Sequence, residues 1–359
     1  MKTILIMAGG TGGHVYPALS VAKSLMNHGI GVVWLGTRSG LESSVVPGEG
    51  IDMEWIDVQG IRRSGWRRKI GSPVMLIRAM LQVYAAISRR KPVAVLGMGG
   101  FVAGPGGLVA WLMRLPLLIH EANTRAGITN RLLAPVARRV MCGFPDTPGL
   151  GRRVEWTGNP VREPILSLPI PEERYGNRQD RVLHLLVVGG SQGARVLNQI
   201  VPEAMAELTP DQRPKVLHQC GRDRAQELFA RYRELDIEVD VREFIEDMAA
   251  AYYQADLVVC RAGAMTVAEI CAAGLAAVLV PYPYAAGNHQ YINAQYLVSQ
   301  GAAIALEESD LSANLLALTV KKFQNDRAQL LSIAQKARAL GCPDAIERVT
   351  GQCLEVASA

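Results

Sequence analysis

The sequence predicts an α/β fold made of two doubly wound parallel sheets, one in each half of the chain. Its length of 359 residues corresponds to two domains at about 150 residues each. Short apolar runs alternate with helical patterns throughout, as expected of parallel strands that are covered by helices on both faces. An opening of strand, glycine loop and helix occurs twice, at 4–13 and at 185–193. A cleft between two such domains would be lined by these loops.

Nine apolar runs are expected to form the strands. Five belong to the first half and four to the second: 3–7, 32–35, 93–96, 117–119 and 139–141, then 183–188, 215–218, 257–260 and 277–280. Between the halves, prolines at 160, 164, 169 and 171 interrupt regular structure and mark the connection.

The composition is that of a globular chain, with 49% apolar and 20% charged residues, which excludes extensive disorder. Six cysteines contain no C-x-x-C pair, so we expect a reducing compartment without a zinc ribbon or a disulfide framework. The apolar run at 4–8 is too short for a signal peptide. The uncharged run between Lys91 and Arg114 holds too many glycines for a spanning helix. We therefore expect a cytoplasmic chain with no transmembrane segment.

The net charge of +5 is distributed unevenly, because residues 58–120 contain ten Lys and Arg residues and no Asp or Glu. This stretch suits an anionic partner, such as phosphates or an acidic lipid surface. A solvated basic face is the alternative interpretation.

Three glycine-rich segments, at 9–13, 97–107 and 189–193, are candidate phosphate loops. A glycine loop before a helix lets backbone N–H groups approach a phosphate closely, although tight turns without a ligand use the same residues. None matches a Walker A motif or the NAD fingerprint. A nicotinamide oxidoreductase remains an alternative, in which Arg38 would favour NADP.

Seven motifs together are similar to those of the MurG family of bacterial glycosyltransferases. They lie, in the family's order, at 7–14, 96–107, 120–123, 158–162, 188–194, 244–249 and 260–269. The resemblance runs end to end and implies a GT-B fold, with two domains facing a deep cleft. It implies an acceptor-binding and membrane-associating domain over 1–163 and a UDP-sugar domain over 164–340. A final helix over 341–359 is expected to pack back on the first domain.

The resemblance implies an inverting glycosyltransferase of peptidoglycan synthesis. It would move N-acetylglucosamine from UDP-N-acetylglucosamine to the muramyl-pentapeptide of lipid I, giving lipid II and UDP. The expected location is the cytoplasmic face of the bacterial inner membrane, as a peripheral protein. Proteins of cell-wall synthesis or cell division are possible partners, and nucleic acid is not. A UDP-sugar epimerase or hydrolase and a non-catalytic nucleotide-sugar-binding module remain alternatives.

Donor binding is assigned from the resemblance. Glu269 would accept hydrogen bonds from the two ribose hydroxyls, which suits a carboxylate, whereas local sequence favours a capping box from Thr266 to Glu269. The resemblance further implies uracil contact near Phe244, diphosphate contact by Arg162, and a role for Asn123 at the donor sugar or acceptor hydroxyl. The remaining implied donor-binding residues are Thr11, Gly12, Gly13, Ser191, Gln192, Ile245, Ala264, Met265, Val267, Gln290 and Asn293. Glycines at the acceptor or phosphate loops are Gly9, Gly10, Gly99, Gly100, Gly104, Gly106 and Gly107.

The transfer needs a base for the attacking hydroxyl and stabilisation of the departing diphosphate. His14, at the start of a helix, is the leading candidate, because the helix dipole there favours neutral imidazole. A structural histidine is the alternative role, and Glu121 is the rival base. No D-x-D motif is evident, so we expect a reaction without metal or other cofactor.

The segment 73–88 is apolar almost all round as a helix, which is typical of buried core. Basic residues flank it on both sides, so a patch that docks on anionic lipid is the second interpretation. The expected membrane patch comprises Trp66, Arg67, Arg68, Lys69, Leu76, Ile77, Met80 and Trp111.

Overall fold

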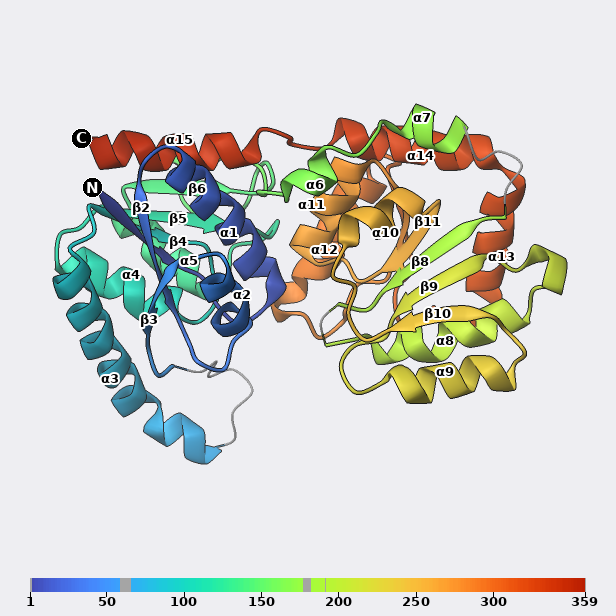
Figure 1. Cartoon of the computed structure of the whole chain (residues 1–359), viewed down its shortest axis with the longest axis horizontal. Helices are drawn as coiled ribbons and strands as arrows, with labels where there is room; N and C mark the ends of the chain where they lie inside the picture. Colours follow the sequence, from blue (N-terminus) through green and yellow to red (C-terminus); the bar gives the residue numbers. More distant parts are fainter. Residues whose placement is uncertain (1, 59–65, 177–181, 191, 359) are drawn as a thin grey trace. The chain divides into compact units, whose positions relative to one another are not determined.

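The computed structural model describes residues 2–58, 66–176, 182–190 and 192–358, with the side chains of 66–72 left out (Figure 1). The chain forms two compact units. Unit 1 comprises Met1–Arg162 and Pro343–Ala359, and unit 2 comprises Glu163–Cys342. The first division lies one residue before the expected boundary, and the second lies two residues after it. The last helix belongs to unit 1.

Within its described residues, unit 1 holds a seven-stranded parallel sheet of order β3-β2-β1-β4-β5-β6-β7. The strands are β1 (Thr3–Met7), β2 (Gly31–Gly36), β3 (Asp52–Trp55), β4 (Ala94–Gly97), β5 (Leu117–Glu121), β6 (Arg139–Cys142) and β7 (Val154–Trp156). The helices are α1 (Gly12–Asn27), α2 (Glu42–Gly48), α3 (Trp66–Arg90), α4 (Ala103–Leu112), α5 (Ile128–Leu133) and α15 (Ala345–Ser358), with a 3-10 turn at Ala134–Val136.

Alternating side chains of β1 face two separate helix layers, as the two-residue period of a strand requires. Ile4 and Ile6 pack with α1, α2 and α15. Leu5 and Met7 pack on the other face with α3, α4 and α5. Both faces of the sheet are therefore covered, which explains why its central strands are continuously apolar.

Unit 2 holds a six-stranded parallel sheet of order β10-β9-β8-β11-β12-β13 in its described part. The strands are β8 (His184–Val188), β9 (Lys215–Gln219), β10 (Val239–Arg242), β11 (Leu257–Cys260), β12 (Ala276–Leu279) and β13 (Ile304–Ala305). The helices are α6 (Glu163–Leu166), α7 (Pro171–Gly176), α8 (Arg195–Ala206), α9 (Ala225–Glu234), α10 (Met248–Gln254), α11 (Ala264–Ala273), α12 (His289–Val298), α13 (Ala313–Asn325) and α14 (Arg327–Ala339), with 3-10 turns at Pro210–Gln212 and Ala286–Asn288. Two doubly wound parallel sheets confirm the predicted fold class.

The nine strands predicted from the sequence are all present, and the sequence missed β3, β7, β10 and β13. These four are the outer strands of the two sheets.

The second glycine-rich segment, 97–107, is only partly a loop. Helix α4 begins at Ala103, so Gly104, Gly106 and Gly107 lie inside it. A Cβ on Gly106 would overlap the Met7 thioether, and one on Gly107 would lie 2.6 Å from Leu133 Cδ1. The prediction that Gly104, Gly106 and Gly107 belong to a loop is wrong, because all three are helical. Gly106 and Gly107 let α4 pack closely on the sheet and on α5.

No helix within the described ranges is both long enough and apolar enough to cross a bilayer.

Candidate functional site

The first glycine loop joins β1 to α1 in unit 1. Thr11 has an extended backbone and precedes the helix, which begins at Gly12. The N–H of His14 donates to the Thr11 carbonyl at 3.0 Å, so His14 lies in the first turn of α1. Gly12 and Gly13 precede it in the same turn, where backbone N–H groups have no helical carbonyl one turn earlier to bond.

The loop after β4 packs directly on the first one. Gly99 and Gly100 have left-handed φ values of 104° and 81°. A Cβ on Gly99 would lie 2.5 Å from Cδ2 of His14, and one on Gly100 would collide with the Gly9 carbonyl. Glycine is required at both positions by backbone conformation and by close approach. The His14 imidazole is therefore held against the second loop.

Glu42 on α2 stabilises the loop between β1 and α1 through hydrogen bonds, and sequence reasoning missed this residue. Its buried carboxylate accepts the Gly10 N–H at 2.9 Å through Oε2. Oε1 accepts the N–H and the hydroxyl of Thr37, each at 2.9 Å. The carboxylate thus ties the loop after β1 to the loop after β2. Arg38, considered above for NADP, lies over the Trp55 ring at 5.1 Å.

Glu121 is the most heavily hydrogen-bonded of the candidate residues. Its Oε1 accepts the backbone N–H and the Nδ2 of Asn123, both at 3.0 Å. Its Oε2 accepts the Gly127 N–H and the Asn130 Nδ2, both at 2.9 Å. The side chain is buried. This geometry makes Glu121 a support for the turn after β5, and favours His14 as the base.

Two of the seven motifs meet at the end of β5. His120 is buried and bonds through Nε2 to the Gly158 carbonyl at 2.9 Å. Burial lowers the pKa of His120, so its neutral imidazole donates this bond. Asn159 donates to the Ala122 carbonyl at 2.9 Å. The segment that ends at Arg162 is therefore fixed to β5.

Arg162 is partly buried, and its guanidinium lies 4.7 Å from the centre of the Tyr16 ring on α1. A Cβ on Gly12 would lie 3.1 Å from the same ring. The arginine is thus placed beside the first turn of α1 and is not a freely solvated charge.

The glycine loop of unit 2 joins β8 to α8. Ser191 lies outside the described residues, and Gln192 is exposed. Gly193 has a φ of 70°, and a Cβ there would collide with the Cys220 carbonyl. The loop after β8 is therefore packed against the loop after β9.

The capping box that local sequence favours, from Thr266 to Glu269, is absent at the start of α11. Helix α11 begins at Ala264 with Gly263 as its N-cap, so Thr266 is the third helical residue and cannot cap. Glu269 lies one turn further along and accepts a hydrogen bond from the hydroxyl of Tyr252 at 3.0 Å. Tyr252 is fully buried on α10. Sequence reasoning missed Tyr252, whose hydroxyl orients the Glu269 carboxylate, the candidate group for binding the ribose.

The other candidate donor residues differ in exposure. Phe244 is exposed and Ile245 is buried. Gln290 accepts the Tyr282 N–H through Oε1 at 2.9 Å. Asn293 is fully buried and donates to the Ala262 carbonyl at 3.1 Å, which supports the segment before α11. In α11, Ala264 and Val267 are buried, whereas Met265 and Thr266 are partly exposed.

The expected membrane patch is apolar and largely exposed where it is described. Ile77 is 59% exposed and Trp111 47%, Leu76 is also exposed, and Met80 is partly buried. The side chains of Trp66, Arg67, Arg68 and Lys69 lie outside the described residues. Further exposed apolar side chains on the same two helices are Val74, Leu81, Tyr84, Leu108 and Leu112. The outward face of α3 is therefore not core.

Within the described ranges, no three His, Cys, Asp or Glu side chains lie close enough to hold a metal ion. Independence from metal stays a prediction.

Both units match family models. The N-terminal domain of glycosyltransferase family 28 matches residues 4–142, and the C-terminal domain of that family matches 184–349. With two doubly wound sheets, these matches define a GT-B glycosyltransferase. A "UDP-N-acetylglucosamine--N-acetylmuramyl-(pentapeptide) pyrophosphoryl-undecaprenol N-acetylglucosamine transferase" of Nitrosococcus oceani is 52% identical, over 99% of each chain. A relative of the same name from Alkalilimnicola ehrlichii is 51% identical over the same share. The chain belongs to the MurG family within glycosyltransferase family 28.

Solved structures agree with this assignment. The crystal structure of MurG from Acinetobacter baumannii matches with a TM-score of 0.83 and 38% identity, covering 99% of this chain and all of that one. A UDP-GlcNAc 2-epimerase from Neisseria meningitidis matches with a TM-score of 0.69 at 14% identity, over 99% of this chain and 100% of that one. The second likeness concerns the fold alone.

Proposed function

We propose that this enzyme transfers N-acetylglucosamine from UDP-N-acetylglucosamine to the muramyl-pentapeptide of lipid I, giving lipid II and UDP in peptidoglycan synthesis. The observation that carries the proposal is the identity of 52% and 51%, over 99% of the chain, to two transferases named for this reaction. Both units also present a glycine loop before a helix, where backbone amides stabilise phosphate groups.

In unit 1, His14 acts as the base. As the acceptor hydroxyl attacks C1 of the sugar, its oxygen forms the new bond and its proton passes to the imidazole. The bond from C1 to the diphosphate breaks with inversion, and its electron pair leaves with UDP. Gly9, Gly10, Gly99 and Gly100 line the packed loops beside His14. Glu42 and Glu121 hold these elements in place and do not exchange protons.

In unit 2, Glu269 binds the ribose hydroxyls of the donor, and the Tyr252 hydroxyl orients that carboxylate. The uracil lies against the backbone near Phe244 and Ile245. The first turn of α11 faces the diphosphate, and the loop with Ser191 and Gln192 also stabilises its developing charge. Arg162, which belongs to unit 1, is a further proposed diphosphate-binding residue. Gln290 and Asn293 recognise the sugar. The reaction uses no metal.

We propose that the enzyme binds the cytoplasmic, anionic leaflet as a peripheral protein, through the apolar face of α3 and α4, and meets its lipid-linked acceptor there. Exposed apolar side chains on these two helices suit insertion at the lipid interface. Other proteins of cell-wall synthesis or division would meet the enzyme at that surface.

Labelled UDP-N-acetylglucosamine, incubated with lipid I in detergent, tests the proposal. We expect label to move into the lipid with release of UDP. Label recovered as free sugar would identify a hydrolase, and label recovered in an isomeric UDP-sugar would identify an epimerase. Binding of labelled UDP-N-acetylglucosamine to the protein without any reaction would identify a non-catalytic nucleotide-sugar-binding module.

A further inference from the structure

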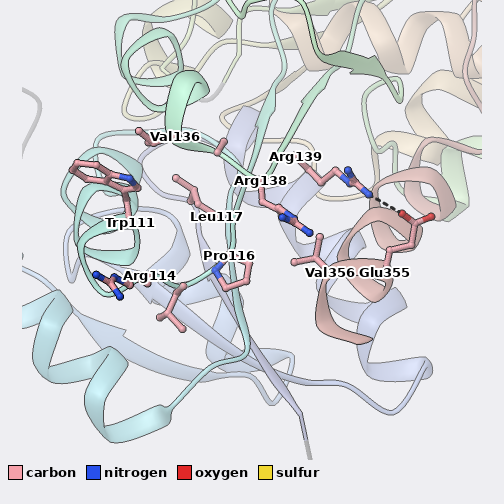
Figure 2. Close-up of a pocket in the computed structure, with 11 residues that line it drawn as sticks. Trp111, Arg114, Pro116, Leu117, Val136, Arg138, Arg139, Glu355 and Val356 are labelled. Atoms are coloured by element: carbon pink, nitrogen blue, oxygen red, sulfur yellow. Dashed lines mark hydrogen bonds and ion pairs between the residues drawn. The ribbon is translucent and has the colours of Figure 1, made fainter. Parts of the chain in front are cut away.

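Arg174, in α7, is the only Lys or Arg that is buried among the residues that the structure describes, and it is 3% exposed. Arg139 is the contrasting case, because both of its ion-pair partners lie at the surface: Figure 2 shows its pair with Glu355, and both side chains are exposed. A pair of that kind contributes little to stability. A buried guanidinium, in contrast, needs hydrogen-bond acceptors for its N–H groups, so the acceptors of Arg174 show what it holds in place.

The guanidinium of Arg174 donates hydrogen bonds to four backbone carbonyls from three segments. Nε donates to the Pro169 carbonyl at 3.1 Å, in the segment before α7. Nη1 donates to the Tyr252 carbonyl on α10 at 3.3 Å. Nη2 donates to the carbonyls of Ala273, the last residue of α11, and of Gly274, the latter at 2.6 Å. One side chain therefore joins the ends of two helices to the segment before α7.

The helices cannot satisfy these carbonyls themselves. The last four C=O groups of an α-helix have no N–H partner inside it. Tyr252 lies two residues before the end of α10, and Ala273 ends α11. The C-terminal end of a helix also carries partial negative charge, which favours a cation. The planar guanidinium has five N–H groups in a fixed fork, so it bonds both helices at once, whereas a lysine has three donors on a single nitrogen.

The segment around Arg174 packs tightly against the same two helices through other contacts. The Tyr175 hydroxyl donates to the Asp256 carbonyl, two residues after α10, at 2.7 Å. It accepts the N–H of Ala276, the first residue of β12, at 3.3 Å. A Cβ on Gly274 would lie 2.7 Å from Cγ of Pro171. These contacts fix α7 in place, so that Arg174 holds α10 and α11 from a rigid support.

The two helices that Arg174 joins carry the candidate ribose-binding pair. The Tyr252 hydroxyl on α10 donates to Oε2 of Glu269 on α11 at 3.0 Å, and Glu269 lies one turn before Ala273. Arg174 thus bonds the backbone of Tyr252 and the last turn of the helix that carries Glu269. Hydrogen bonds of the O–H···O type are about 2.5–3.0 Å long. A shift of α10 away from α11 by about 0.5 Å would therefore break the bond between Tyr252 and Glu269.

We infer that Arg174 is a positioning residue for donor binding, which holds α10 and α11 at the separation that the hydrogen bond from Tyr252 to Glu269 requires. The inference rests on the proposed function, in which Glu269 binds the ribose hydroxyls. Arg174 acts on the nucleotide through Tyr252 and Glu269. The segment 163–176, which follows the end of unit 1 at Arg162, thereby takes part in donor recognition.

Calorimetric titration of the full chain with UDP tests this inference without turnover. R174K keeps the charge but has too few donors for four carbonyls, so the Kd for UDP should rise about tenfold, as it should on loss of the hydroxyl in Y252F. In R174K/Y252F the bond to Glu269 is already absent. The Kd of this double variant should therefore also rise about tenfold, whereas independent effects would multiply to about 100-fold. R174Q, which keeps two N–H donors, gives the same comparison if R174K does not fold.

R213K is the matched control in unit 2. Arg213 also donates to two backbone carbonyls, those of Leu208 at 3.2 Å and Asp236 at 2.7 Å, which follow α8 and α9. R213K should lower the melting temperature and leave the Kd for UDP within twofold of the original.

Two results would overturn the positioning role of Arg174. The first is a lower melting temperature of R174K with a Kd for UDP within twofold of the original, as in the control. The second is a rise of about 100-fold in R174K/Y252F, which would show that Arg174 acts independently of Tyr252. Failure of the proposed function is distinguishable: the unchanged chain would bind UDP, with the expected effect of R174K, but transfer no label to lipid I. A chain that does not bind UDP would overturn both.

Discussion

Tyr252→Phe removes one hydroxyl and tests how donor binding depends on it. The Tyr252 hydroxyl donates to Oε2 of Glu269 at 3.0 Å, and phenylalanine fills the same buried space without a cavity. A hydrogen bond to a charged group is worth about 1.5–3 kcal/mol. Because Glu269 is partly exposed, we expect its bond to Tyr252 to contribute an energy at the lower end of this range. A loss of about 1.4 kcal/mol is a factor of about ten, so the KM for UDP-N-acetylglucosamine should rise about tenfold with little change in kcat.

Initial rates against donor concentration at saturating acceptor measure this change, and calorimetric titration with UDP measures it without turnover. Tyr232→Phe is the matched control in the same unit. Its buried hydroxyl bonds Nδ1 of His218 at 2.9 Å, and its loss should lower stability while KM stays constant. A KM for Tyr252→Phe within twofold of the original, while Glu269→Ala raises it strongly, would refute the positioning role.

Three further predictions concern protonation, the base and metal. Burial lowers the pKa of His218 to about 3 from about 6.5 in the unfolded chain, so the unfolded state takes up the proton first as pH falls. The His218 contribution to the free energy of unfolding should be complete above about pH 6.5 and about 2 kcal/mol lower at pH 5. A free energy of urea unfolding that is the same at pH 7 and at pH 5 would contradict this. His14→Ala should lower turnover by a factor of about 10²–10⁴ and leave the melting temperature unchanged. Glu121→Gln should instead lower the melting temperature, because the buried carboxylate that accepts four hydrogen bonds is altered. Near-normal turnover of His14→Ala at saturating substrates would exclude His14 as the base. Activity should persist in EDTA, and its loss with recovery on adding Mg²⁺ would disprove metal independence.

The strands that the sequence reveals are the ones buried on both faces. Residues 4–7 of β1 and 257–260 of β11 are fully buried, and they read as continuous apolar runs. The outer strand β10 alternates partly buried and exposed residues along Val239–Arg242, and β13 has only two residues. Such strands are defined by their neighbour and not by an apolar pattern of their own, which is why all four outer strands escaped prediction.

The candidate site was predictable where its residues are local. His14 follows its loop along the chain, so its place at the helix start could be derived from sequence. Glu42 and Tyr252 act on Gly10 and Glu269, which lie 32 and 17 residues away, and only folding brings them together. The motif from Thr266 to Glu269 has the residue types of a cap, but the helix begins two residues earlier, at Ala264.

The last helix has a consequence for the order in which the protein matures on the ribosome. Val349 and Cys353 of α15 are fully buried in the core that contains Ile4, Ile6 and α1. Residues 163–342 form a unit that is continuous in the chain, so they can fold as soon as they emerge. Residues 1–162 are synthesised first but lack part of their core until 343–359 appear. The half made first is thus completed last, and a nascent chain stalled before residue 343 would expose the apolar side of α1 to chaperones and to aggregation.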